Sequence, residues 1–321
     1  MRLWLALTAG TYGSLLLSCA AGTVKQTSES IDSKLPVAVV VQQEISGYIL
    51  SQTLKQPAGL AVDKFGYLYL CDQGNNRIIK FDSNLIPLRE AGGYGNEDGL
   101  FKRPVDIVVD DDNRVLVSDA SNRRIQQLDT ALYYRTQMRL EDSDDPLKFG
   151  TPSGLAVTHD GSLRIADNER NDLIFLTNNG VFEKLVGDLG YRGGQLSDPQ
   201  GVAVDREDNV FVCDAGNGRV AVYDKYAEFQ RAISPEGLIR PVSILIDHSN
   251  RLWILDQSTN QIFLCRPDGK LSSTQPIPIF GANPPIEKVH GLAFLKDGRL
   301  LITDTGNNRL LVCKLVFGSG D

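Results

Sequence analysis

A carboxylate, an imidazole and a guanidinium at Asp106, His290 and Arg103 form the set of side chains in this chain best suited to chemistry. Such groups can act as general base, general acid and anion clamp, as a lyase-type or lactonase-type reaction requires. Each of them stands at or next to the start of a short apolar segment, and such segments recur along the chain. The recurring segments therefore decide whether the three side chains can meet.

One sequence unit recurs six times. It begins as Pro-Ala-Gly-Leu-Ala-Val-Asp at Pro57, and the later copies begin at Pro104, Pro152, Pro199, Pro241 and Val289. Fifteen residues after each of these positions stands an aspartate: Asp72, Asp119, Asp167, Asp214, Asp256 and Asp304. The offset is constant whereas the lengths between copies vary, which indicates a repeated structural unit joined by surface loops.

Within a unit the pattern is that of β-strands. In the first copy a buried apolar strand at 59–62 precedes a turn, a second strand at 67–71, a Gly/Asn-rich turn at 72–77 and a third strand at 78–81. A fourth, more variable strand completes each unit, and four antiparallel strands in about 45 residues are typical of a propeller blade. The sequence therefore predicts an all-β, six-bladed β-propeller whose first strands surround the axis.

The motifs Pro-x-Gly-Leu-Ala-Val-Asp and Leu-Tyr-Leu-Cys-Asp-x-Gly-Asn-Asn-Arg-Ile resemble the NHL repeat of six-bladed β-propellers. The resemblance extends from near Pro57 to Phe317. WD40 and kelch propellers would show Trp-Asp or paired Gly and aromatic signatures, and the units contain neither.

The last unit needs a strand from elsewhere in the chain. Its third strand is expected to end near 312–315, and residues 316–321 are too few for a loop and a fourth strand. The apolar segments 37–41 and 47–50 precede the first unit without a blade of their own. We predict that one of them closes the ring, so that no sheet edge is left open and deletion of residues 36–52 unfolds or aggregates the domain.

The six aspartates are expected to be scaffold, because a feature that repeats around a ring does not mark a single active site. In four units an Asn follows the Asp after three residues and an Arg after five: Asn75, Asn122, Asn217, Asn307, Arg77, Arg124, Arg219 and Arg309. The Asp and Asn are expected to cap the turn, and the Arg to pair with a carboxylate of its own or a neighbouring blade.

Positions at which the units differ are the candidates for binding. The first strands of all blades start on one face, around the mouth of the central channel. Seven residues there would form a polar, partly cationic mouth: Arg103, Asp106, Gln200, Arg240, Ser243, Lys288 and His290. The alternative is that they are solvated rim residues.

Several classes of site are disfavoured. His159 and His248 fall in hairpin turns at the face opposite His290, so no catalytic zinc site, and no metal or cofactor, is predicted. The acidic run 141–145 does not match an EF-hand and is expected to be a solvated loop rather than a calcium site. With 33 basic against 40 acidic residues, no nucleic-acid partner is expected.

The cysteines of the units are expected to be buried free thiols. Cys71 and Cys213 belong to blades on opposite sides of the ring, and Cys265 and Cys313 hold equivalent positions on adjacent blades. Equivalent positions on adjacent blades are farther apart than a disulfide allows.

Residues 1–18 resemble a lipoprotein signal peptide, because Leu16-Leu17-Ser18-Cys19 is similar to a bacterial lipobox. Cys19 would then carry the lipid, and Ala20 after it resembles the outer-membrane sorting pattern. Residues 19–35 would be a flexible tether and 36–321 the propeller. An ordinary signal peptide cut after Ser18 or Ala20 is the alternative.

These features favour a binding platform, lipid-anchored in the bacterial cell envelope at the outer membrane and facing the periplasm. Its partner would be an envelope protein or a small anionic ligand. The alternative is a lyase or lactonase-like hydrolase that uses Asp106, His290 and Arg103 at the channel mouth.

Overall fold

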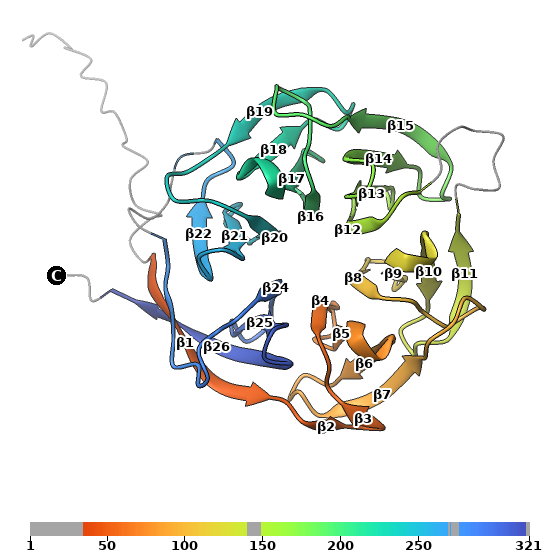
Figure 1. Cartoon of the computed structure of the whole chain (residues 1–321), viewed down its shortest axis with the longest axis vertical. Helices are drawn as coiled ribbons and strands as arrows, with labels where there is room; N and C mark the ends of the chain where they lie inside the picture. Colours follow the sequence, from red (N-terminus) through yellow and green to blue (C-terminus); the bar gives the residue numbers. More distant parts are fainter. Residues whose placement is uncertain (1–34, 140–148, 269, 271–275, 319–321) are drawn as a thin grey trace, which may run out of the picture. The chain divides into compact units, whose positions relative to one another are not determined.

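The computed structural model describes residues 35–139, 149–268, 270 and 276–318. The predicted signal peptide, Cys19, the acidic run 141–145 and all of the predicted tether except Leu35 lie outside the described residues. The described residues form six β-sheet blades around a common axis (Figure 1), as the repeat predicts. Within this part of the chain no helix has the length and hydropathy that crossing a membrane requires.

Every blade follows the same antiparallel order from the axis outwards. The innermost strands are β4 (Pro57–Val62), β8 (Pro104–Val109), β12 (Pro152–Val157), β16 (Pro199–Val204), β20 (Pro241–Ile246) and β24 (Val289–Phe294). The second strands are β5 (Leu68–Asp72), β9 (Val115–Asp119), β13 (Leu163–Asp167), β17 (Val210–Asp214), β21 (Leu252–Asp256) and β25 (Leu300–Asp304). The third strands are β6 (Arg77–Phe81), β10 (Arg124–Leu128), β14 (Asp172–Leu176), β18 (Arg219–Tyr223), β22 (Gln261–Cys265) and β26 (Arg309–Phe317). The outer strands of the first four blades are β7 (Pro87–Gly92), β11 (Tyr134–Met138), β15 (Phe182–Gly187) and β19 (Phe229–Ile233).

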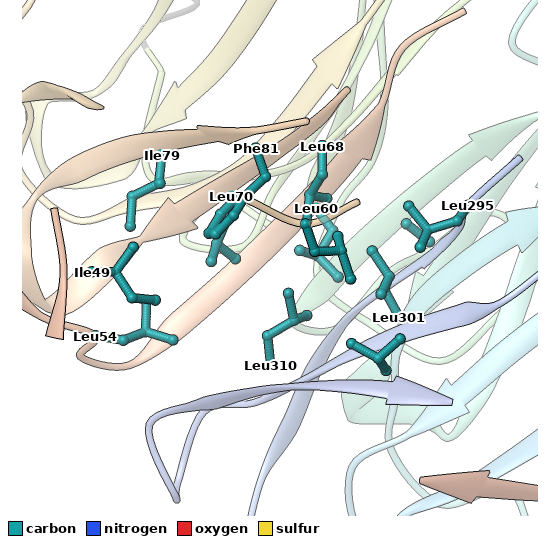
Figure 2. Close-up of a cluster of buried hydrophobic side chains, with 13 residues drawn as sticks. Ile49, Leu54, Leu60, Leu68, Leu70, Ile79, Phe81, Leu295, Leu301 and Leu310 are labelled. Atoms are coloured by element: carbon teal, nitrogen blue, oxygen red, sulfur yellow. The ribbon is translucent and has the colours of Figure 1, made fainter. Parts of the chain in front are cut away.

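The core lies between the blades rather than inside any one of them. Side chains alternate between the two faces of a strand, so Leu68 and Leu70 of β5 pack towards blade six while Tyr69 and Cys71 pack towards blade two. Figure 2 shows the cluster between blades six and one, where Leu301 of blade six packs in the same cluster as these leucines. Each fully buried side chain of this size contributes about 1.5–3 kcal/mol.

The N-terminal strand closes the ring, as predicted. Strand β1 (Pro36–Ile45), which contains the segment 37–41, pairs antiparallel along β26 on its outer side (Figure 1). Val39 of β1 is fully buried in the cluster between blades five and six. The other candidate segment contributes instead to a small hairpin of β2 (Tyr48–Ile49) and β3 (Gln52–Thr53).

Blade five departs from the four-strand pattern in its described residues. Its outer position holds a single bridge, in which Ile277 and Ile262 exchange backbone hydrogen bonds of 2.7 and 3.1 Å. The chain then pairs with β1 through the short strand β23 (Ile279–Phe280), and Val39 N–H donates to Pro278 O at 3.0 Å. Within the described residues this segment is shared between blades five and six, and it pairs with β22 only at this bridge.

The four cysteines of the propeller are free and buried, as predicted: Cys71, Cys213, Cys265 and Cys313. Burial raises the pKa of the Cys265 and Cys313 thiols to about 12. These thiols therefore act as small apolar side chains in the clusters between blades.

Candidate functional site

The upper face, as we call it, is the face on which the innermost strands begin. The six buried aspartates that end the second strands fix this face, because each accepts a hydrogen bond from the backbone of one or both residues that precede an innermost strand. Asp72 binds the N–H of Lys55 at 2.9 Å, for example, and Asp119 binds that of Lys102 at 2.7 Å. In every blade this carboxylate therefore sets the backbone from which the mouth side chains extend. The expected capping of the turn is found in blades three and five, where Asp167 and Asp256 accept backbone N–H groups of the turn. Asp72, Asp119 and Asp214 make no such bond and instead bind the Asn and Arg side chains of the turn.

In four blades the turn arginine pairs with the aspartate of its own blade. The Arg124 Nε to Asp119 Oδ2 distance is 2.7 Å, and both side chains are fully buried. Asn122 also donates to Asp119 and to the backbone of Gly95 in the preceding loop, at 2.8 Å each. These buried or half-buried ion pairs, with the hydrogen bonds of the arginines to loop carbonyl groups, hold the loops of the upper face against the second and third strands.

Sequence reasoning missed a second set of positioning residues. Asn76, Asn171 and Asn308 adopt left-handed conformations at the end of the turn, and their Oδ1 atoms accept the N–H of Arg103, Asp198 and Gln56 in the next blade at 2.8 Å. The signal was present in the turn sequence, because Asn is among the few non-glycine residues that tolerate this conformation.

A channel of about 1850 Å³ runs along the axis, and all seven predicted mouth residues line it. It is also lined by Lys55, Gln56, Asp198 and Glu287 at the upper face. His248 lies in the turn between β20 and β21 and lines the channel far from the upper mouth. His159 lies in the corresponding turn of blade three, where it contacts Asp208 of blade four. Among the described residues there is no group of three or more His, Cys, Asp or Glu side chains that could hold a metal ion.

Two of the predicted mouth residues are engaged with Asp198. The Arg240 guanidinium forms an ion pair with this carboxylate, and Gln200 Nε2 donates to its other oxygen at 2.5 Å. The charge of Arg240 is therefore already compensated on the side of the mouth formed by blades four and five.

Asp106 has a packing role that the sequence did not reveal. A glycine occupies the third position of four of the innermost strands, and at Gly59 a Cβ would lie only 2.7 Å from Asp106 Oδ1 of the next blade. Asp106 replaces that glycine in blade two and accepts the N–H of Leu155 in blade three at 2.8 Å. Burial raises the pKa of Asp106 to about 7, although hydrogen bonds from the Leu155 and Ile107 backbone favour the ionised form.

The charged groups that act on His290 are cationic. Burial, together with the positive charges of Lys288 and Arg103, lowers the pKa of His290 to about 4, so the imidazole is neutral at pH 7. The charge of Arg103 thus lowers the pKa of His290, whereas burial and backbone hydrogen bonds determine the pKa of Asp106. The structure gathers the three candidate catalytic residues in one channel but couples only two of them electrostatically.

The side chains of Lys55, Arg103 and Lys288 have no acidic partner within the part of the chain that the structure describes. All three line the channel, and their residues are exposed. They come from blades one, two and six, which are consecutive around the ring. This arrangement can attract an anion into one half of the mouth.

Comparisons with known proteins agree with this architecture. A family model described as NHL repeat matches residues 101–128, 196–223 and 288–313, which cover the first three strands of blades two, four and six. Three of the six units therefore match the NHL repeat. The chain is 24% identical over 286 residues to E3 ubiquitin-protein ligase NHLRC1 of Mus musculus, covering 84% of this chain and 68% of that protein. It is 33% identical over 84 residues to human NHL repeat-containing protein 3, covering 25% of this chain and 24% of that protein.

Solved propeller structures are similar in fold. The chain matches a streptogramin B lyase with a TM-score of 0.63 at 14% identity, over 85% of this chain and 97% of that one. It matches a gluconolactonase from Xanthomonas campestris with a TM-score of 0.62 at 16% identity, over 88% of this chain and 97% of that one. At such low identities the likeness shows the fold alone.

Proposed function

We propose that this chain is a binding platform of the bacterial cell envelope, which holds a protein or a small anionic ligand at its upper face. NHL propellers generally mediate protein interactions. The single observation that carries the proposal is the uncompensated charge of Lys55, Arg103 and Lys288 around an open channel mouth. A surface of this kind favours association with an acidic partner.

Exposed apolar side chains on the same face support a protein partner. Tyr94 and Tyr191, in the loops that lead into blades two and four, are 75% and 74% exposed. Both loops are anchored at the upper face, because Asn122 and Asn217 donate to Gly95 O and Gly190 O at 2.8 Å. Exposed aromatic residues beside basic ones are typical of protein-binding surfaces.

Site-specific photo-cross-linking tests the proposed face. A photoreactive phenylalanine analogue replaces Tyr94 or Tyr191 in the full chain, expressed in its native cells. Phe65 is the matched control, because it is an aromatic residue that is 62% exposed in the turn between β4 and β5, which lies on the other face. We expect the same adduct from Tyr94 and Tyr191 and none from Phe65. Adducts from Phe65 alone, or from no position, would contradict the proposal.

The membrane anchor is part of the same proposal. Its support is the Leu16-Leu17-Ser18-Cys19 sequence and the uncharged stretch before it. Metabolic labelling with a radioactive or clickable fatty acid should mark the wild-type chain and not a Cys19→Ser variant, which should also leave the membrane fraction. Equal labelling of both chains, or none of either, would refute lipidation at Cys19.

A further inference from the structure

The cationic half, as we call it, is the part of the upper channel mouth that carries Lys55, Arg103 and Lys288. The chain as a whole has a net charge of −7, so a local excess of positive charge is not a consequence of its composition. In blades six, one and two the two residues before each innermost strand are Glu287, Lys288, Lys55, Gln56, Lys102 and Arg103. In blades three, four and five they are Gly150, Thr151, Ser197, Asp198, Ile239 and Arg240. The first half has four basic residues against one acidic residue, whereas the second has one of each.

The backbone of the cationic half is firmly held although its charged ends are not. Lys55 N–H donates to Asp72 at 2.9 Å, and Lys288 N–H donates to Asp304 at 3.3 Å. Arg103 has a φ of +58°, a conformation that non-glycine residues avoid, and the bond from its N–H to Asn76 holds it there. The fold thus fixes where three cationic side chains begin and leaves their charged ends available.

The carboxylates nearby do not neutralise these cations. Asp106 binds the Leu155 backbone, and Asp198 is paired with Arg240 in the other half. Glu287 is exposed, and its stem packs against Gly306, where a Cβ would lie 2.7 Å from the Glu287 Cβ. No ion pair joins Glu287 to Lys55, Arg103 or Lys288 among the described residues.

We propose that the cationic half binds an acidic peptide segment of the partner, one that presents two or more carboxylates in succession. The proposal deepens the function proposed above and rests on it. Cations that arise from three separate blades can meet successive carboxylates of an extended chain, and Arg103 can bind one of them through two nitrogens. The aromatic rim favours a peptide as well, because Lys102 already lies over the Tyr94 ring at 5.4 Å, where apolar residues of a partner can pack.

The test measures the affinity of a fluorescently labelled peptide of alternating glycine and glutamate for the full chain. A peptide of alternating glycine and glutamine is the uncharged comparison. Arg103→Gln and Lys288→Gln each remove one cation from the mouth, whereas Lys225→Gln removes the same charge from an exposed turn between β18 and β19. Thermal melts establish that the variants are folded.

We expect the glutamate peptide to bind and the glutamine peptide to bind at least about tenfold more weakly, because the contacts are electrostatic. Arg103→Gln and Lys288→Gln should each weaken binding about threefold to tenfold, and Lys225→Gln should change it less than about twofold. Equal binding of the two peptides, or equal losses in all three variants, would overturn the proposal. Glutarate that binds as tightly as the peptide would assign the site to a small dicarboxylate and would also overturn it.

Asn76 provides a positioning test that separates geometry from charge. Asn76→Ala removes the acceptor for Arg103 N–H, whereas Asn308→Ala removes the equivalent acceptor for the uncharged Gln56. Both variants lose the same bond at the same place in the repeat. We expect only Asn76→Ala to weaken binding of the glutamate peptide and to reduce its salt dependence. Equal effects of the two variants would show a structural role alone. Failure of these binding tests would leave the cross-linking test of the upper face unaffected, so the two proposals can fail separately.

Discussion

At the scale of single residues, buried carboxylates connect the scaffold to the candidate site. Asp119 binds Arg124 through one oxygen and the backbone N–H of Lys102 through the other. A single side chain therefore holds a turn, a loop and the approach to an innermost strand. Removal of such a carboxylate would leave a buried guanidinium without its partner, which is among the costliest changes in a protein interior.

Asp106→Asn tests the environment of the half-buried mouth carboxylate. The folded protein retains the Asp106 proton up to about pH 7, whereas the unfolded chain, with the ordinary pKa of 3.8, has already released it. The contribution of Asp106 to the free energy of unfolding therefore falls as pH rises from about 4 to about 7. Because Asn carries no charge, the variant should gain stability relative to wild type over this range, by an amount on the order of a few kcal/mol.

Calorimetric melting temperatures of both chains across this pH range measure the effect. The lowered pKa of His290 acts in the opposite direction, because stability then rises with pH between about 4 and 6.5. The His290 contribution is present in both the wild type and the variant, so it cancels when their melting temperatures are subtracted. Asp111→Asn, at an exposed position, is the control and should give a flat difference. A flat difference for Asp106→Asn as well would show that its carboxyl is solvated.

At the scale of elements, β1 decides whether the ring is closed. It comes from before blade one in the sequence, and it pairs with both β26 and β23. Glu44 of β1 also pairs with Arg309, the turn arginine of blade six, at 2.9 Å. The strand therefore supports the last blade and its junction with blade five through β23.

Substitutions on β1 should separate closure from surface effects. Val39 is fully buried and Val37 is 55% exposed on the same strand. Val39→Asp buries a charge and should cost several kcal/mol of unfolding free energy, whereas Val37→Asp should change it by less than about 0.5 kcal/mol. Chemical denaturation monitored by circular dichroism measures both. Similar unfolding midpoints for Val39→Asp and Val37→Asp would contradict the role of β1 in closing the ring. Deletion of residues 36–52 tests the same role by removing the whole strand.

The repeat made the elements predictable, but not all their partners. Short apolar runs, turn residues and the fixed Asp offset placed the strands and the closing segment, because all three reflect local geometry. The pairing of Arg240 with Asp198 joins adjacent blades across 42 residues, and no local pattern encodes it. The spacing role of Asp106 likewise depends on how closely two innermost strands approach, which sequence spacing does not report. The recurring glycines of the innermost strands could be seen in the repeat. The close approach of neighbouring innermost strands, which requires them, could not.

At the scale of the whole molecule, a repeated scaffold carries an unrepeated charge pattern. The aspartates and the clusters between blades recur around the axis, while one half of the channel mouth is cationic and the other is compensated. Lys55, Arg103 and Lys288 are exposed and do not belong to the clusters between blades. Substitutions of these three residues should therefore have little effect on the core.

Competition at the cross-linked upper face is the most direct test of this account. The photoreactive analogue at Tyr94 captures the native partner while either the glycine–glutamate or the glycine–glutamine peptide is present in excess. We predict that the glutamate peptide abolishes the adduct and that the glutamine peptide leaves it intact, because partner and peptide occupy the same cationic half. An adduct that persists undiminished with the glutamate peptide would contradict the account.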